Sequence, residues 1–149
     1  MKRLAATVAA LVTVIGFSVT SIPTASATVT CATHFAGRGS GAAGDPYLVS
    51  SALDLDAVRD CLSSHFLQTA NITLSGDWIP IGGPTLADPF TGTFDGGNFT
   101  INGLANTNAH PSPTRDAYGL FLATNAATLQ NITLTGVNIT VDWDNVGAL

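Results

Sequence analysis

Asn71-Ile72-Thr73-Leu74 and Asn131-Ile132-Thr133-Leu134 are two copies of one tetrad, and Asn138-Ile139-Thr140-Val141 is a close variant of it. The tetrads lie in a region, beginning after Phe66, where short runs rich in Ile, Thr, Val and Phe alternate with Gly, Asn and Asp. Short β-branched runs that are bounded by turn-forming residues are typical of strands. No helical period appears in this region, so it is predicted to be all-β.

The repeats also suggest how the strands are arranged. We expect strands at residues 71–74, 78–81, 91–94, 99–101, 119–122, 128–134, 137–141 and 146–149. Gly119-Leu120-Phe121 and Gly147-Ala148-Leu149 form a second repeated pair. A repeat in the range of about 20–50 residues predicts a solenoid, whose coils bury their apolar faces by stacking on one another. An ordinary β-sandwich is the alternative.

One helix is expected before the β region. Ser51 and Asp54 resemble a capping box in which Asp replaces Glu, and a carboxylate in the first turn is favoured by the helix dipole. Apolar residues then recur at helical spacing, at Leu55, Val58 and Leu62. The pattern predicts an amphipathic helix over about 53–64, with Asp54 serving as a cap rather than as a catalytic acid.

The first residues have the layout of a secretory signal peptide. Lys2 and Arg3 precede an apolar run over 4–17, and the small residues Ala25-Ser26-Ala27 follow. A retained membrane anchor would need about 20 apolar residues, and the run is too short. We therefore expect residues 1–27 to be removed and residues 28–149 to be secreted to the extracellular space or the cell surface. No later run is long enough to span a membrane.

Export places the two cysteines, Cys31 and Cys61, in an oxidising compartment. Two cysteines in an exported chain predict one disulfide, with two buried free thiols as the alternative. The three histidines are scattered along the chain, at His34, His65 and His110. Metal binding needs more ligands than these residues supply at useful spacing, so neither a metal site nor a cofactor is predicted.

The composition disfavours several functional classes. Charged residues make up only 10% of the 149 residues, and after residue 27 the strong bases are Arg38, Arg59 and Arg115, against ten aspartates. Such a chain cannot form the basic stripe that binds nucleic acid. It has no Glu, which excludes the HExxH zinc peptidases. Residues 39–44 satisfy GxGxxG, but Asp45-Pro46 follows directly, so no dinucleotide-binding helix can begin there.

Four asparagines, Asn71, Asn98, Asn131 and Asn138, each begin an N-x-T triplet. In a eukaryotic secreted protein these triplets would be glycan acceptors. Because they coincide with the repeats, we favour a structural role, in which asparagine turns the chain at the corners between strands.

Two groups of acids are the best candidates for chemistry. Asp95 precedes Gly96, and Asp142-Trp143-Asp144-Asn145 forms a second cluster. Their oxygens could bind calcium, and Asp142 with Asp144 could act as a carboxylate pair in glycoside hydrolysis. Turn formation explains both groups more simply. Trp78 and Trp143 could stack on sugars but are more typical of packing residues, so no catalytic residue is assigned.

Several ordered motifs together resemble the N-terminal part of bacterial secreted proteins with GLUG-type repeats. They are Gly39-Ser40-Gly41 with residues 45–49, the run 53–59, residues 91–104 around Phe94-Asp95-Gly96-Gly97, and Tyr118-Gly119-Leu120-Phe121. The resemblance covers residues 37–149. It implies an all-β fold, a right-handed parallel β-helix of pectate-lyase-like architecture that begins with a capping α-helix. Proteins of this kind are described as surface proteins or as adhesin-like.

Two functions are consistent with these observations. The first is a non-enzymatic, exported β-helix protein for adhesion or scaffolding, with an unknown surface ligand for which carbohydrate is one candidate. The second is the front of a polysaccharide-acting lyase or hydrolase whose catalytic coils lie beyond residue 149. In either case the sequence ends within its second Gly-Leu-Phe-type motif, at residues 147–149, so we expect the solenoid to be truncated at its C-terminal end.

Overall fold

The computed structural model describes residues 30–82, 87–107, 118–140 and 147–149. Several predictions concern residues outside these ranges. They are the signal peptide over 1–27, His110, and the Asp142-Trp143-Asp144-Asn145 cluster. Among the described residues, no helix is both long and apolar enough to cross a membrane.

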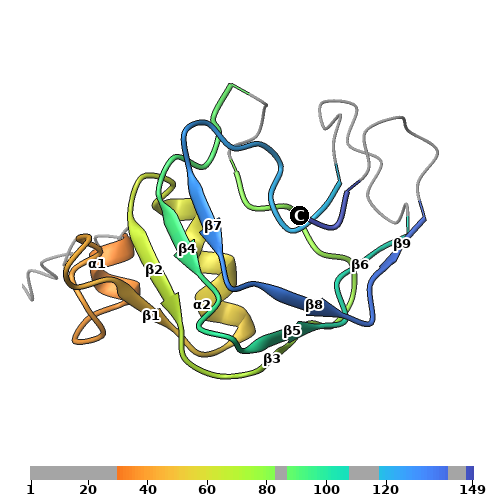
Figure 1. Ribbon diagram of the computed structural model, residues 1–149, viewed down its shortest axis with the longest axis horizontal. Helices are drawn as coiled ribbons and strands as arrows, with labels where there is room; N and C mark the ends of the chain where they lie inside the picture. The colour runs from red at the N-terminus through yellow and green to blue at the C-terminus, as the bar shows by residue number, and fades with distance from the viewer. Residues whose placement is uncertain (1–29, 83–86, 108–117, 141–146) are drawn as a thin grey trace, which may run out of the picture.

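Two short helices lie near the start of the described chain (Figure 1). Helix α1 (Cys31–His34) is a single turn, and α2 (Ala52–Ala57) continues into the 3-10 helix η1 (Val58–Asp60). The Ser51 side chain accepts a hydrogen bond from the Asp54 backbone at the start of α2, as the capping pattern predicts. The helix is shorter than the expected 53–64, because the backbone at Cys61 is no longer helical.

The rest of the described chain is mostly strand. The strands are β1 (Tyr47–Val49), β2 (His65–Gln68), β3 (Ile72–Thr73), β4 (Thr93–Asp95), β5 (Thr100–Asn102), β6 (Ala105–Asn106), β7 (Thr128–Gln130), β8 (Thr133–Thr135) and β9 (Asn138–Ile139). They form three small sheets with the orders β1-β2-β4-β7, β3-β5-β8 and β6-β9. Each pair of neighbouring strands is parallel.

The predicted right-handed parallel β-helix with an N-terminal capping α-helix is wrong for the described residues. A regular solenoid stacks similar repeats, so that each coil contributes a strand to every sheet. Here the three sheets contain four, three and two strands of only two to four residues. The chain between paired residues also lengthens from one pairing to the next, as Tyr47 pairs with Phe66, Phe66 with Phe94, and Phe94 with Leu129. Two of the expected strands, 78–81 and 119–122, contribute isolated bridges instead.

Side chains alternate between the inside and the outside of the four-stranded sheet. Tyr47, Phe66, Phe94 and Leu129 occupy one register row, and the first three are buried. The next row along the strands, which contains Leu48, points away from the core and is partly exposed. This alternation is the period-two pattern of a sheet that is packed on one face only.

Within the core, aromatic rings from successive segments of the chain contact one another. Phe35 stacks on Tyr47 with ring centroids 4.7 Å apart, and Tyr47 lies 5.8 Å from Phe66. Phe90 lies 6.2 Å from Phe66 and 5.0 Å from Phe121. These separations are within the range of favourable aromatic pairs. The rings therefore form one connected file through the interior.

Asparagine and glycine turn the chain between sheets. Asn131, which separates β7 from β8, has a φ of 54°, and Asn98, which precedes β5, has a φ of 60°. Asparagine tolerates this left-handed backbone better than most residues do. All four N-x-T asparagines are exposed, but only these two have a positive φ. The expected corner role is therefore seen at two of the four positions.

Trp78 is a packing residue, with only 9% of its surface exposed. Its indole Nε1 donates a hydrogen bond to the Leu120 carbonyl, and the Arg59 guanidinium lies 5.4 Å from the ring centroid. Arg59 also donates to the Ile79 carbonyl and to the Asp56 carboxylate. Both the ring and the guanidinium therefore connect η1 to the loop over 78–81, and the Trp78 ring is not free to stack on a sugar.

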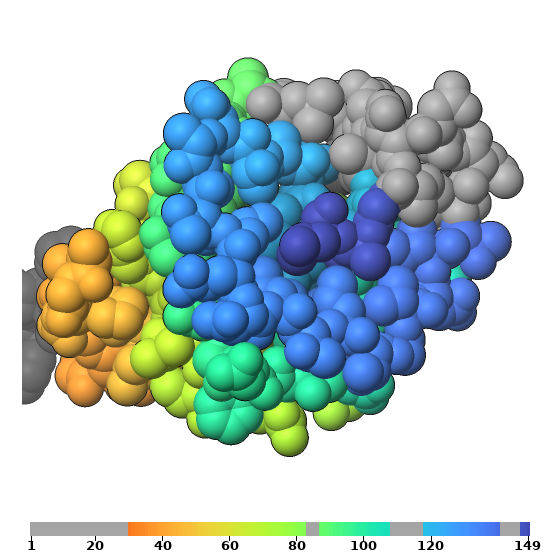
Figure 2. All heavy atoms as spheres, viewed as in Figure 1, coloured from red at the N-terminus to blue at the C-terminus, as the bar shows by residue number. Residues whose placement is uncertain are grey.

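The last strand of each sheet has a strand neighbour on one side only, among the described residues. Figure 2 shows the blue segment that contains β7, β8 and β9 covering much of the visible face. Leu129, Leu134 and Ile139 point inward from these strands but are only partly buried. The interior is therefore less fully covered at this edge than around β2 and β4.

The predicted disulfide between Cys31 and Cys61 is confirmed. It joins α1 to the end of η1 and closes a loop with a sequence separation of 30 residues. By the chain-entropy estimate, a loop of this length stabilises the fold by about 3 to 4 kcal/mol.

We expect thiol titration of the unreduced, unfolded protein to find no free thiol. Reduction should lower the free energy of unfolding by about 3 kcal/mol, measured by urea denaturation. The double variant Cys31→Ser/Cys61→Ser serves as the control, because its stability should equal that of the reduced protein with or without reductant. Two titratable thiols in the untreated protein would contradict the expectation.

Candidate functional site

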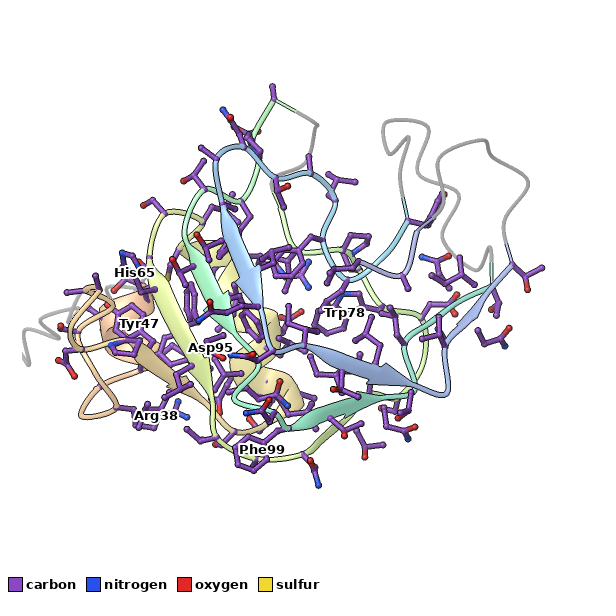
Figure 3. The ribbon with its side chains drawn as sticks, in the orientation of Figure 1. Arg38, Tyr47, His65, Trp78, Asp95 and Phe99 are labelled. Atoms are coloured by element: carbon purple, nitrogen blue, oxygen red, sulfur yellow. A yellow bond between two sulfur atoms is a disulfide. The ribbon has the colours of Figure 1, made fainter. Side chains whose placement is uncertain are left out.

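The outer face of the four-stranded sheet carries a row of polar side chains. His65 on β2 pairs in register with Thr93 on β4, and Asp95 on β4 pairs with Gln130 on β7. The inward positions between them are apolar, so alternation along the strands directs these four side chains to the opposite face. Figure 3 shows His65 at the start of β2 and Asp95 at the end of β4.

A groove of about 200 Å³ lies over this face. Its polar lining consists of the four side chains named above, and its apolar lining includes Pro46 and Leu67. Figure 2 shows the orange N-terminal segment, then the segments that contain β2, β4 and β7, following one another across the left side of the molecule. A concave site with an apolar lining and a few convergent polar groups is typical of small-ligand binding.

Asp95 is held in place by three N–H donors. Its Oδ1 accepts hydrogen bonds from the Asn131 side chain at 3.0 Å and from the Gly97 backbone at 2.9 Å. Its Oδ2 accepts from Gln130 Nε2 at 2.8 Å. The bonds from Asn131 and Gly97 are the main reason that the pKa of Asp95 is lowered from its ordinary value. The groove therefore contains an oriented, ionised carboxylate.

His65 and Thr93 are the polar residues of the groove whose side chains are available to a ligand. Within the described part of the chain, neither the imidazole nor the Thr93 hydroxyl forms a hydrogen bond. Both side chains are only partly buried. Paired side chains on neighbouring strands lie close together, so a ligand that contacts one of them can also reach the other.

The arrangement is suited to binding more than to acid–base catalysis. Asp95 is the one carboxylate among the described residues that line the groove. Glycoside hydrolysis uses two carboxyl groups, one of which needs a raised pKa to act as the acid. The pKa of Asp95 is instead lowered, and its oxygens already accept three hydrogen bonds.

The geometry also bears on the calcium hypothesis for Asp95. The bond from the Gly97 backbone to Asp95 Oδ1 is that of an Asx turn, which is the simpler role that the sequence suggested. In the described ranges, no group of three or more His, Cys, Asp or Glu side chains could hold a metal ion. The Asp142-Trp143-Asp144-Asn145 cluster lies outside those ranges.

From the sequence, Asp95 is the one residue of this groove that stands out as a candidate. His65 is one of three scattered histidines, and no motif marks Thr93 or Gln130. The available signal was alternation, since His65-Phe66-Leu67, Thr93-Phe94-Asp95 and Thr128-Leu129-Gln130 each enclose one inward apolar residue. The strand register needed to place these triplets side by side could not be read from one sequence.

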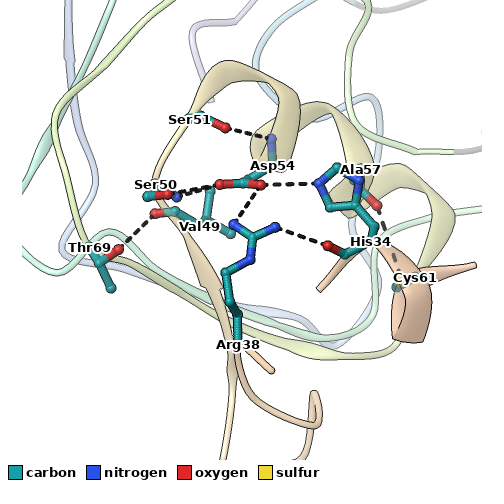
Figure 4. A network of polar contacts seen from close by, with 9 residues as sticks. All are labelled: His34, Arg38, Val49, Ser50, Ser51, Asp54, Ala57, Cys61 and Thr69. Carbon is teal, nitrogen blue, oxygen red and sulfur yellow. Dashed lines mark hydrogen bonds and ion pairs between the residues drawn. The ribbon is translucent and has the colours of Figure 1, made fainter. Parts of the chain in front are cut away.

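A second polar cluster surrounds Asp54, which is only 4% exposed (Figure 4). Its carboxylate lies 2.8 Å from Arg38 Nη1 and 3.1 Å from His34 Nε2. It also accepts hydrogen bonds from the backbone and hydroxyl of Ser50, each at 3.0 Å. Asp54 therefore does more than cap α2, because it joins the segment that contains α1 to that helix.

Two opposing effects act on the pKa of Asp54. Burial favours the neutral acid and would raise the pKa. The hydrogen bond from the Ser50 backbone, followed by those from Arg38 and His34, outweighs burial and lowers the pKa far below its ordinary value. The carboxylate is engaged by partners within the chain, so we assign this network a structural role.

A wider depression of about 570 Å³ lies beside the disulfide. Its described lining includes Cys31, Cys61, Tyr47 and a single charged residue, Asp60. Its other polar residues, Thr30 and Ser64, come from the start of α1 and the turn before β2 rather than from paired strands, and we therefore take the groove on the four-stranded sheet as the candidate functional site.

Replacing the buried carboxylate should change how stability depends on pH. Because folding lowers the pKa of Asp54, its contribution is present above the unfolded-state pKa of about 4 and is lost as the pH falls below it. We expect Asp54→Asn to lower the free energy of unfolding at neutral pH by about 2 kcal/mol. The difference from the wild type should shrink below about pH 4 in urea denaturation series.

The matched control is Asp56→Asn, because the Asp56 side chain is 58% exposed although it also pairs with an arginine. Exposed pairs contribute little, so this variant should stay within about 1 kcal/mol of the wild type. Stability curves of the wild type and Asp54→Asn that remain parallel down to acid pH would contradict the assignment.

Comparisons with known protein families, curated proteins and solved structures found no match to this chain. The resemblance to GLUG-repeat proteins therefore stays a prediction.

Proposed function

We propose that this chain is an exported, non-enzymatic protein of the cell surface or extracellular space, with an adhesin-like role, and that its groove binds a saccharide. The observation that carries the proposal is the convergence of His65, Thr93, Asp95 and Gln130 on one face of the four-stranded sheet. These groups combine hydrogen-bond donors and acceptors with an apolar lining. A sugar ring presents the complementary mixture of hydroxyl groups and C–H faces.

The position of the groove also favours binding. Its polar side chains extend from neighbouring strands rather than from separate loops, so their spacing is set by the backbone pairing of β2, β4 and β7. Rigid elements hold a binding group more accurately than loops do. The bonds from Gln130 and Asn131 to Asp95 restrict the carboxylate further.

The surface role rests on the sequence. The leader over 1–27 supports export, and the motifs shared with GLUG-repeat proteins support an adhesin-like function. The low content of charged residues is also consistent with a surface that recognises neutral polar groups.

The binding function can be tested on an array of immobilised oligosaccharides with the purified protein. We expect the double variant His65→Ala/Thr93→Ala to bind any captured glycan about 30-fold more weakly, since two hydrogen bonds of about 1 kcal/mol each are lost. Isothermal titration with the captured glycan measures the change.

The matched control is Thr133→Ala, an exposed threonine on β8 of the three-stranded sheet. This variant should bind as the wild type does, because Thr133 does not line the groove. No captured glycan, or equal binding by the groove variant and the wild type, would refute the proposed function.

Export can be tested separately by expressing the full chain in a bacterial host. We expect the product outside the cytoplasm to begin at Thr28, as read by N-terminal sequencing. Replacing Ala25 and Ala27 with bulky residues should block processing. Recovery of an intact, cytoplasmic chain that begins at Met1 would contradict the proposal of export.

A further inference from the structure

We infer that the groove selects uncharged saccharides and rejects acidic ones, with Asp95 as the specificity-determining residue. The inference rests on the proposed function, because it names the class of saccharide that the same groove accepts. It concerns the charge of the ligand, which the binding proposal leaves open.

Asp95 cannot easily move away from a bound ligand. Three N–H groups, from Gly97, Gln130 and Asn131, fix both of its oxygens within 3.0 Å. Gly97 follows in the same turn, while Gln130 and Asn131 come from the neighbouring strand β7 and its end. Hydrogen bonds from N–H groups orient a carboxylate but leave its negative charge uncompensated by any cation.

Both arginines of the described residues pair with carboxylates outside the groove. Arg38 pairs with the buried Asp54 and donates to the His34 carbonyl. Arg59 pairs with Asp56 and donates to the Ile79 carbonyl. Neither arginine lines the groove. His65 is the only described basic side chain that does, so an acidic sugar would meet the carboxylate of Asp95 without an arginine or lysine to offset the repulsion.

Hydroxyl groups are well matched by the same side chains. A carboxylate has about four acceptor positions, and three are occupied at Asp95, which leaves room for one hydroxyl donor. Gln130 is exposed and donates through Nε2, and no hydrogen bond engages its Oε1 within the described chain. The Asp95–Gln130 pair therefore presents two adjacent acceptors, an arrangement that suits neighbouring hydroxyl groups of an uncharged sugar.

The test compares two probes that differ in one group on each sugar ring, a neutral hydroxymethyl or a charged carboxylate. These are glucose oligomers and the same oligomers oxidised at C6 to carboxylates, titrated into the purified protein at fixed pH. We expect the neutral oligomer to bind about tenfold more tightly at low salt, which corresponds to about 1.4 kcal/mol. Added salt should reduce the difference, because the groove is open to solvent and repulsion there is screened.

Two variants connect the selectivity to Asp95. Asp95→Asn removes the charge, and Gln130→Lys places a cation on the exposed neighbouring position of β7. Both should reduce the tenfold preference to about twofold or less, and the second does not alter the turn at Asp95. Asp60→Asn is the matched control, because it removes one exposed negative charge outside this groove and should leave the preference unchanged.

The outcomes separate this inference from the proposed function. Equal binding of the neutral and acidic oligomers by the wild type would overturn the inference but would not contradict saccharide binding in the groove. A preference that survives both groove variants, or that does not respond to salt, would also overturn it. If the wild type binds neither oligomer, the inference fails for these sugars, and the glycan array decides separately whether the groove binds saccharides.

Discussion

The structure depends on the alignment of inward-facing side chains across parallel strands. Tyr47, Phe66, Phe94 and Leu129 occupy one row of the four-stranded sheet, and neighbouring rings from Phe35, Phe90 and Phe121 connect to this row. A shift of one residue in any strand would turn its apolar side chain outward and its polar neighbours into the core. The packing of the rings fixes the strand register, and the register determines which side chains reach the outer face. The core and the groove therefore depend on the same alignment of strands.

Local features of the fold could be predicted from the sequence. The pairing of Cys31 with Cys61 follows from there being two cysteines in a chain with a predicted signal peptide, and the start of α2 follows from Ser51 at the cap position. The expectation of strands after Phe66 is also confirmed, since the regular elements described there are all strands. The expected strand over 128–134 is two strands, β7 and β8, because Asn131 adopts a left-handed backbone between them. In each case the deciding interaction lies within a few residues, or is covalent.

Long-range features could not be predicted in the same way. The repeated tetrads suggested a regular solenoid, but similar sequences at unequal intervals form small sheets of different sizes. Strands β1 and β2 were not among the predicted strands, since their short sequences gain strand geometry from pairing with each other. Asp95 could be selected as a turn-forming acid, whereas its neighbours in the groove could not. Their proximity depends on the register between β2, β4 and β7, which is fixed by packing rather than by local sequence.

The order of the strands has a consequence for how such a chain can assemble. In each sheet the strands follow one another in space as they do along the chain, so β2 adds to β1, β4 adds to β2, and β7 adds to β4. Parallel pairing between distant segments is intrinsically slow, because a long loop must close before the pairing contributes. Here each sheet grows in one direction, on an edge that an earlier segment has already formed. A polypeptide that emerges from a translocation channel with its N-terminus first would therefore present its strands in the order in which the sheets can accept them.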